Sequence, residues 1–255
     1  MSTFFWRKPW IVLLALLGLD SHAGLVEVVA AAKPAVVAGG TFNATASPRF
    51  TFRGTGFVVG DGSQVVTNAH VLPEAADNTF GTELSVSLPL GGGIIESRTA
   101  TLVRVDRTHD LALLRVEGNR LPITLKLAAP EPVAEGLAVV FMGFPVGGIL
   151  GFSTVTHRGI VSAVTRIVLP QANAKSLNER TVAQMRDGTF DIYQLDGTAY
   201  PGNSGGPLLD GESGQVIGVI NMVLIKGTRE SALSNPTGIT YAIPVRYVRE
   251  LLSAP

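Results

Sequence analysis

The sequence contains no cysteine, and this absence removes several kinds of chemistry at once. Without thiols the chain cannot form disulfides, cysteine-ligated zinc, iron–sulfur sites or a thiolate nucleophile. Charged residues are also scarce, at 16% against roughly 25% in average soluble domains. The 20 basic side chains are balanced by 20 acidic ones, so the chain lacks the basic excess that nucleic-acid binding requires. Side-chain catalysis must therefore use oxygen or imidazole groups.

Long apolar runs are missing as well. Residues 9–19 form an uncharged, apolar run of 11 residues, whereas a membrane-spanning helix needs about 20. The run follows Arg7 and Lys8 and precedes the small residues around Ser21–Ala23, an order that predicts a signal peptide over residues 1–23 with cleavage after Ala23. We therefore expect an exported protein, periplasmic or secreted, with no stable membrane insertion after signal cleavage.

Glycine and proline are plentiful, with 29 and 15 residues, and 46% of the chain is hydrophobic. This composition excludes the disordered class. Short β-rich segments recur between turn residues without helical patterns of 10–15 residues between them, which favours an all-β barrel or sandwich; they are residues 56–59, 64–67, 84–88, 111–116 and 138–141. The proline-containing stretch 118–133 is interpreted as a linker between two barrels. Short helices are expected at residues 25–33, ending before Pro34, and at residues 244–252.

Two residues with catalytic potential lie at ends of predicted strands. His70 follows the apolar segment 65–69, and Asp110 directly precedes the strand 111–116. A histidine in this position can act as a general base, and a carboxylate beside an apolar strand needs a donor such as a histidine N–H. Alone, each has an ordinary alternative, a structural histidine and a turn-capping aspartate. Asp106 competes with Asp110, which is preferred because it directly precedes the strand.

The most specific segment is Pro201–Leu209, where three glycines surround Ser204. Glycines permit backbone conformations closed to other residues and can direct several N–H groups into one concavity. The Ser204 hydroxyl would lie beside the amides of Gly202 and of Ser204 itself, which is how a nucleophile and an oxyanion hole are combined. An ordinary glycine-rich turn is the alternative for this segment taken alone.

Together, the three segments resemble the trypsin-like (chymotrypsin-fold) serine proteases, and among them the HtrA/Deg type. The resemblance extends over roughly residues 25–252, and its matching segments are residues 54–59, 66–72, 110–116, 143–145, 154–156, 159–162, 202–208 and 240–244. It implies two six-stranded antiparallel β-barrels with short N- and C-terminal helices. The domain organisation expected is residues 24–125 for the first helix and barrel and residues 126–255 for the second barrel and last helix.

The resemblance also implies a role for each site residue. Ser204 is the nucleophile, His70 the general base and acid, and Asp110 the group that orients the imidazole. The oxyanion hole is assigned to Gly202–Ser204, with the amides of Gly202 and Ser204 as donors and Asn203 between them. No metal or cofactor takes part in this mechanism.

Two departures from the digestive proteases are informative. Those enzymes have an aspartate before the nucleophile that pairs with a new N-terminal amine, whereas this chain has Asn203. Activation by clipping is therefore not expected, and other contacts must order the loop. The specificity pocket is expected to have Thr198 at its base and Ile220, Asn221 and Met222 in its wall. This set predicts a small or medium aliphatic residue before the scissile bond.

The leading hypothesis is a serine endopeptidase that acts on protein or peptide substrates and hydrolyses peptide bonds of unfolded proteins. The alternatives are a non-catalytic peptide-binding or chaperone-like protein on the same fold, and ester hydrolysis by the same residues. The long segments 168–191 and 224–238 are either regulatory loops or variable surface loops. His157 receives no role. The chain length is expected to leave no room for a C-terminal PDZ domain.

Overall fold

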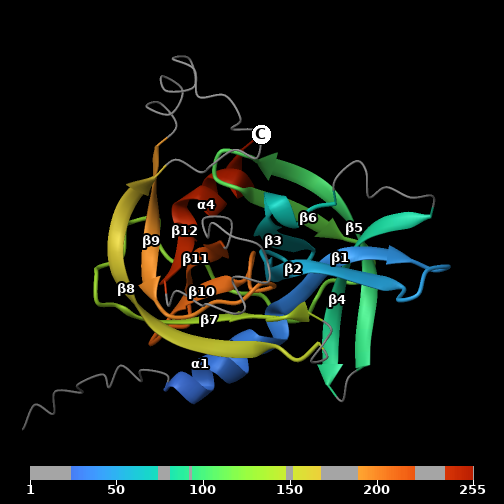
Figure 1. The fold of residues 1–255 in the computed structure, drawn as a ribbon, viewed down its shortest axis with the longest axis horizontal. Helices are drawn as coiled ribbons and strands as arrows, with labels where there is room; N and C mark the ends of the chain where they lie inside the picture. Colours follow the sequence, from blue (N-terminus) through green and yellow to red (C-terminus); the bar gives the residue numbers. More distant parts are fainter. Residues whose placement is uncertain are drawn as a thin grey trace, which may run out of the picture.

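The computed structural model describes residues 24–73, 81–91, 94–147, 152–167, 189–221 and 239–254. The predicted signal peptide, Met222, and most of the two long loops lie outside these residues. Within them the chain forms two closed barrels of six antiparallel strands each (Figure 1), which confirms the predicted fold class. Neither helix of the described residues has the length and apolar character that a membrane crossing requires.

The first barrel closes in the order β1-β2-β3-β6-β5-β4, with β4 paired to β1. Its strands are β1 (Val36–Asn43), β2 (Phe50–Val59), β3 (Gln64–Asn68), β4 (Thr82–Gly91), β5 (Ile94–Asp106) and β6 (Leu111–Val116). The second barrel repeats this order as β10-β11-β12-β9-β8-β7. Its strands are β7 (Ala138–Gly143), β8 (Val155–Ile167), β9 (Phe190–Asp196), β10 (Pro207–Asp210), β11 (Val216–Asn221) and β12 (Ile239–Pro244).

Both predicted helices are present. Helix α1 (Leu25–Ala32) ends just before the proline-containing 3-10 turn Lys33–Ala35. Lys33, which precedes Pro34, keeps helical backbone with φ of −53° and ψ of −40°, so the chain passes into the 3-10 turn without the extended residue expected before a proline. Helix α4 (Val245–Ser253) begins directly after Pro244. It contacts β5 and β6 of the first barrel and β11 and β12 of the second, and Figure 1 shows it lying between the two barrels. The last helix therefore joins the two halves of the molecule.

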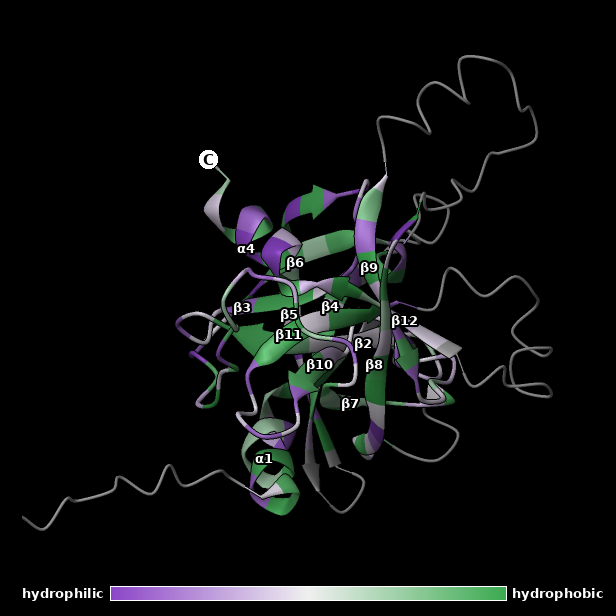
Figure 2. Cartoon of the chain, turned by 90° about the vertical axis from the view of Figure 1, so that its left-hand side faces the viewer, coloured by the Kyte–Doolittle hydropathy of each residue, from purple (hydrophilic) through white to green (hydrophobic). Residues whose placement is uncertain are grey.

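Apolar side chains from both barrels form a shared core. One buried cluster contains Phe57 and Leu113 of the first barrel together with Val140 and Val219 of the second and Val248 of α4. A smaller cluster, which includes Phe141, Tyr193 and Ile220, fills the second barrel alone. Figure 2 shows the corresponding apolar stretches along β10 and β11. The barrels are thus packed against each other, and their junction provides a rigid place for a functional site.

Candidate active site

His70 and Asp110 are brought together by the pairing of two strands. β3 and β6 run antiparallel, and Asn68 at the end of β3 is the register partner of Leu111 at the start of β6. His70 lies in the short 3-10 turn Ala69–Val71 that follows β3, and Asp110 immediately precedes β6. Because antiparallel strands place the end of one beside the start of the other, residues 40 positions apart become neighbours.

The Asp110 carboxylate is enclosed by donors. Its Oδ2 lies 2.5 Å from His70 Nδ1 and accepts from Asn221 Nδ2 at 2.8 Å, while its Oδ1 accepts from the backbone N–H of His70 at 2.9 Å. Its backbone carbonyl accepts from Asn68 Nδ2 at 2.9 Å and from the Ala69 N–H at 3.1 Å. Asp110 is only 8% exposed, and buried charge of this kind is tolerated when it is fully hydrogen-bonded. This arrangement fixes the orientation of the His70 imidazole through its Nδ1 atom.

The backbone of Asp110 has φ of 52°, in the left-handed region that aspartate enters more readily than most side chains. This conformation follows the turn from β5, in which Asp106 binds a different histidine: Asp106 Oδ2 lies 2.5 Å from His109 Nδ1. The two aspartates of the turn therefore have separate partners. Asp110 is the one that faces His70.

Ser204 lies in the segment between β9 and β10, where residues 201–204 form what we call the oxyanion loop. All four carbonyl groups of this loop accept hydrogen bonds. The donors, from Pro201 to Ser204 in order, are the Val146 N–H at 2.8 Å, Thr55 Oγ1 at 2.6 Å, the Gly206 N–H at 3.0 Å and the Thr55 N–H at 2.8 Å. Thr55 belongs to β2, so the first barrel holds the loop of the second barrel at two points.

Two amides of the oxyanion loop are left without a partner among the described residues, those of Gly202 and Ser204. The peptide between Pro201 and Gly202 has its carbonyl bonded to Val146, and the N–H of a trans peptide points to the opposite side. Gly202 has φ of 107°, and a Cβ there would lie 2.2 Å from the Phe144 carbonyl oxygen, so only glycine fits. The N–H of Asn203 donates to the Tyr200 carbonyl at 2.9 Å; unlike the two residues beside it, Asn203 offers no free amide donor.

The loop is supported by a strained residue. Val146 has φ of 61°, which is unfavourable for a β-branched side chain, and its N–H is the donor that holds the Pro201 carbonyl. Ser204 is 5% exposed, and the His70 side chain is 33% exposed. No hydrogen bond joins Ser204 Oγ to His70 within the described part of the chain; such bonds are often long without substrate.

The structure uses two of the four predicted pocket residues differently. Ile220 is fully buried and packs in the core of the second barrel with Phe141 and Tyr193. Asn221 is buried and donates to Asp110. Neither side chain presents an exposed surface to a substrate residue. Thr198 is partly exposed in the segment after β9, whereas Met222 lies outside the described residues.

Several contacts of the site residues were not predicted from sequence. Asn68 and Asn221 donate to Asp110, Thr55 anchors the oxyanion loop, and His157 on β8 contacts the side chain of Asn203 at 3.2 Å. The only local signal was that Asn68 and Thr55 stand inside segments that resemble the family. The contacts of Asn221 and His157 depend on strands far apart in the chain.

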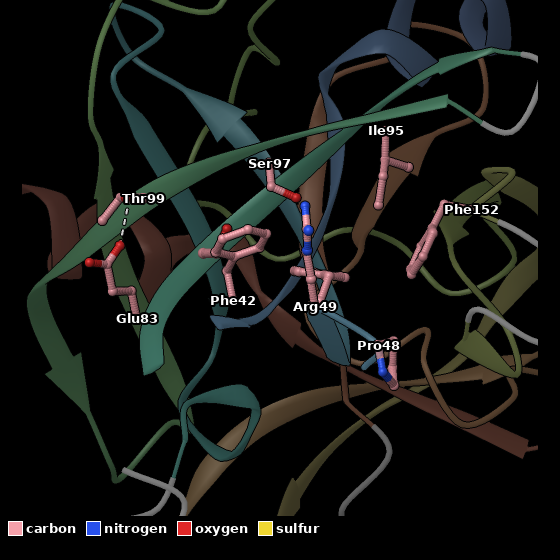
Figure 3. Close-up of a pocket in the computed structure, with 10 residues that line it drawn as sticks. Phe42, Pro48, Arg49, Glu83, Ile95, Ser97, Thr99 and Phe152 are labelled. Carbon is pink, nitrogen blue, oxygen red and sulfur yellow. Dashed lines mark hydrogen bonds between the residues drawn. The ribbon is translucent and has the colours of Figure 1, made fainter. Parts of the chain in front are cut away.

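A separate cavity of about 610 Å³ lies on the first barrel. Figure 3 shows its wall, which combines the aromatic rings of Phe42 and Phe152 with the charged side chains of Arg49 and Glu83. Glu83 Oε2 accepts from Thr99 Oγ1 at 3.1 Å across part of this wall. None of the residues that line it belongs to the His70, Asp110 and Ser204 arrangement, so the cavity is distinct from the candidate active site.

Two packed antiparallel barrels, with a His–Asp pair on the first and a glycine-framed serine on the second, define the protease domain of the trypsin-like class. The model of the trypsin-like peptidase domain family matches residues 54–219. The chain belongs to this family, and its relatives identify it as a protease domain of the HtrA type.

Two curated relatives illustrate the similarity. The chain is 32% identical over 203 residues to the mitochondrial serine protease HTRA2 of Drosophila willistoni, covering 78% of this chain and 37% of that protein. It is 36% identical over 194 residues to a probable periplasmic serine endoprotease, DegP-like, of Halomonas elongata, covering 75% of this chain and 32% of that protein. The chain therefore spans about a third of the length of these relatives.

The crystal structure of Deg5 has a similar fold. It superposes with a TM-score of 0.61 at 27% sequence identity, covering 88% of this chain and 90% of that chain. The likeness thus includes nearly the whole of both chains.

Proposed function

We propose that this protein is a serine endopeptidase that hydrolyses peptide bonds of unfolded proteins through an acyl-enzyme on Ser204. The observation that supports this most strongly is the coexistence of two arrangements at the barrel junction. The Asp110 carboxylate is bonded to His70 Nδ1 and to two further donors. The oxyanion loop has all its carbonyls occupied and the Gly202 and Ser204 amides open.

The proposed reaction begins when Ser204 Oγ attacks the scissile carbonyl carbon. His70 Nε2 takes the hydroxyl proton, and the charge on the resulting imidazolium is stabilised by Asp110, which keeps its own ionisation. The carbonyl oxygen becomes an oxyanion and accepts from the Gly202 and Ser204 amides, each contributing about 3 kcal/mol. His70 then gives its proton to the leaving amine, and water releases the acyl group by the same steps.

Pre-organisation explains why the described contacts favour catalysis. Donors that are already fixed where charge develops need no reorganisation during the reaction. Thr55 and Val146 fix the peptide planes of the oxyanion loop, and Asn221 and the His70 N–H fix the carboxylate. A protein that only binds peptides has no need for both arrangements.

The proposal extends to substrate preference and to location. A neutral Thr198 at the pocket base supports an uncharged, small or medium aliphatic residue before the scissile bond, with Met222 as its remaining predicted wall. Export to the periplasm or beyond is supported by the signal-like residues 1–23 and by the periplasmic relative. The mitochondrial relative shows that related domains also serve elsewhere.

Hydrolysis of a fluorescently labelled unfolded protein such as casein tests the proposal. The wild-type chain is expected to release labelled fragments, and Ser204→Ala is expected to lose at least about 10³-fold of the rate, as is usual when the nucleophile of a triad is removed. Ser213→Ala, an exposed serine in the turn after β10, is the matched control and should retain full activity. Equal turnover by the wild type and Ser204→Ala would show that another group performs the hydrolysis.

A further inference from the structure

His157 is a half-buried histidine of β8 that lies against the oxyanion loop. It is the register partner of Phe141 on β7, and the two rings stack with centroids 4.8 Å apart and planes inclined by 13°. Its Nε2 lies 3.2 Å from Asn203 Nδ2. One face of the imidazole ring thus stacks on Phe141, and its edge contacts Asn203, the residue between Gly202 and Ser204.

The direction of this hydrogen bond defines the protonation state of the ring. In the structure Asn203 Nδ2 faces the ring and can only donate, so this arrangement assigns the acceptor role to His157 Nε2, without a proton on that nitrogen. A neutral ring that accepts at Nε2 has its proton on Nδ1. If the ring gains a second proton, two donors face each other and the bond is lost.

Among the described residues, no other side-chain hydrogen bond of Asn203 replaces this one. Its side chain is fully buried, and its Oδ1 is buried without a hydrogen-bond partner. Its backbone N–H and carbonyl belong to the turn that orients Gly202 and Ser204. Since a neutral asparagine cannot make the ion pair that orders this loop in digestive proteases, the contact with His157 is the one that fixes its side chain.

The surroundings of His157 favour the neutral ring. Burial lowers the pKa of His157 below the ordinary value of a histidine. Phe141 packs from β7, and Tyr200, with its ring centroid 6.1 Å away, packs from the segment after β9. Arg158 is exposed and follows His157 on the strand, where side chains alternate between faces; Asp196 on β9 is exposed and pairs with Ile160.

We propose that neutral His157 is a positioning residue for the oxyanion loop, and that its protonation releases Asn203 and lowers the rate of the chemical step. This inference rests on the proposed peptidase activity. It adds the titration of His157 to the acid side of the pH–rate profile. We expect the effect on kcat, because the amides of the oxyanion loop stabilise the oxyanion charge, which develops only in the transition state.

Two variants separate positioning from a merely structural role. His157→Gln retains an acceptor near the position of Nε2 but does not titrate, and His157→Leu removes the acceptor. With a small peptide substrate, His157→Gln should keep kcat near pH 8 within about threefold of the wild type and should show an acid limb with one fewer ionisation. His157→Leu should lose about tenfold or more in kcat near pH 8, with KM little changed, and its difference from the wild type should narrow as the pH falls and the wild-type ring gains its second proton. Arg158→Gln is the control and should reproduce the wild-type profile.

Thermal unfolding of each variant shows whether it is folded at the assay temperature. A wild-type kcat in His157→Leu, or an unchanged acid limb in His157→Gln, would overturn the proposal. Long-range ¹H–¹⁵N spectra of the histidine rings provide a readout that does not need catalysis. The expected result is the Nδ1–H tautomer for His157, with a titration midpoint below that of an exposed histidine. An Nε2–H tautomer would contradict the inference even if the chain is an active peptidase, whereas inactivity with the expected tautomer would contradict the proposed function alone.

Discussion

Asp110 is the residue whose environment the sequence described least completely. Its position before an apolar strand predicts that its carboxylate needs a hydrogen-bond donor, and His70 is the predicted donor. The structure adds Asn221, whose Nδ2 reaches the same Oδ2 from β11 of the other barrel at 2.8 Å. The carboxylate therefore depends on contacts from both halves of the molecule.

Replacing Asn221 tests this dependence. Asn221→Ala removes one hydrogen bond to a charged group, worth about 1.5–3 kcal/mol, so kcat/KM should fall by about 10- to 100-fold. Asn221→Ser retains a hydroxyl that can donate and should give an intermediate loss. Steady-state kinetics with circular dichroism on each variant checks the prediction, and unchanged kinetics in folded Asn221→Ala would show that this bond does not orient Asp110.

At the residue scale, sequence reasoning succeeded where the signal was local. Asp110 could be separated from Asp106 because only Asp110 directly precedes β6, and the structure shows Asp106 bonded to His109 instead. Asn221 and Ile220 were predicted in a pocket wall, whereas in the structure Asn221 donates to Asp110 and Ile220 lies in the core of the second barrel. Whether a strand residue faces a cleft, a carboxylate or the core depends on the register of β11, which no local pattern specifies.

Helix α4 contacts both barrels. One of its contacts with the second barrel is an ion pair with Asp191 on β9. Arg246 in its first turn places Nη2 2.5 Å from Asp191 Oδ2, and Arg166 of β8 approaches Oδ1 at 3.2 Å. The hydrogen bond from Arg246 is the main cause that lowers the pKa of Asp191 below its ordinary value of 3.8. The pair should therefore add stability to the attachment of α4.

The pH dependence of this contribution has a defined sign. Because the pKa of Asp191 is lower in the folded chain than in the unfolded chain, the stabilisation is complete above about pH 4 and is lost as the pH falls through the folded value. For a partly exposed pair we expect about 1 kcal/mol, or roughly 2–4 °C in Tm. Asp191→Asn should show this loss at pH 6 and converge with the wild type near pH 2.

Thermal unfolding at several pH values measures this difference. Asp196→Asn, an exposed aspartate at the end of the same strand, is the matched control and should leave Tm unchanged. A loss that is equally large at pH 2 and pH 6 would show that Asp191 acts through packing rather than through its charge.

At the element scale, the five strand segments predicted from sequence lie within five of the twelve strands observed in the described residues, and both predicted helices lie within one residue of their observed bounds. The segments 111–116 and β6 coincide, and the expected helix at residues 25–33 ends one residue earlier as α1. The length of a strand was underestimated where glycine interrupts the β-branched pattern. β2 begins at Phe50, six residues before the predicted segment. Pairing with both β1 and β3 extends such strands, and pairing partners are not visible in one segment.

The two barrels share the larger of the two buried apolar clusters. Residues of β2, β6, β7, β11 and α4 belong to a single buried cluster, although we propose that the domain boundary falls between residues 125 and 126. Separation of the halves would expose this apolar surface to water. We therefore expect one cooperative unfolding transition, with equal calorimetric and van't Hoff enthalpies. Differential scanning calorimetry that resolves two independent transitions would refute this expectation.

The division of the site between the barrels provides a test of whether Ser204 is an activated nucleophile. His70 and Asp110 belong to the first barrel and Ser204 to the second, so an activated serine requires the complete fold. A fluorophosphonate probe reacts with a serine only when a general base and an oxyanion hole activate it. Labelling should therefore distinguish a peptidase from a peptide-binding protein on the same fold.

The most direct measurement is mass spectrometry of the chain after treatment with such a probe. We predict one adduct, located on Ser204, and its loss in His70→Ala and in Ser204→Ala. Absence of an adduct on the folded wild-type chain, or labelling of Ser204 that persists in His70→Ala, would contradict the assignment of Ser204 as a nucleophile activated by His70 and Asp110.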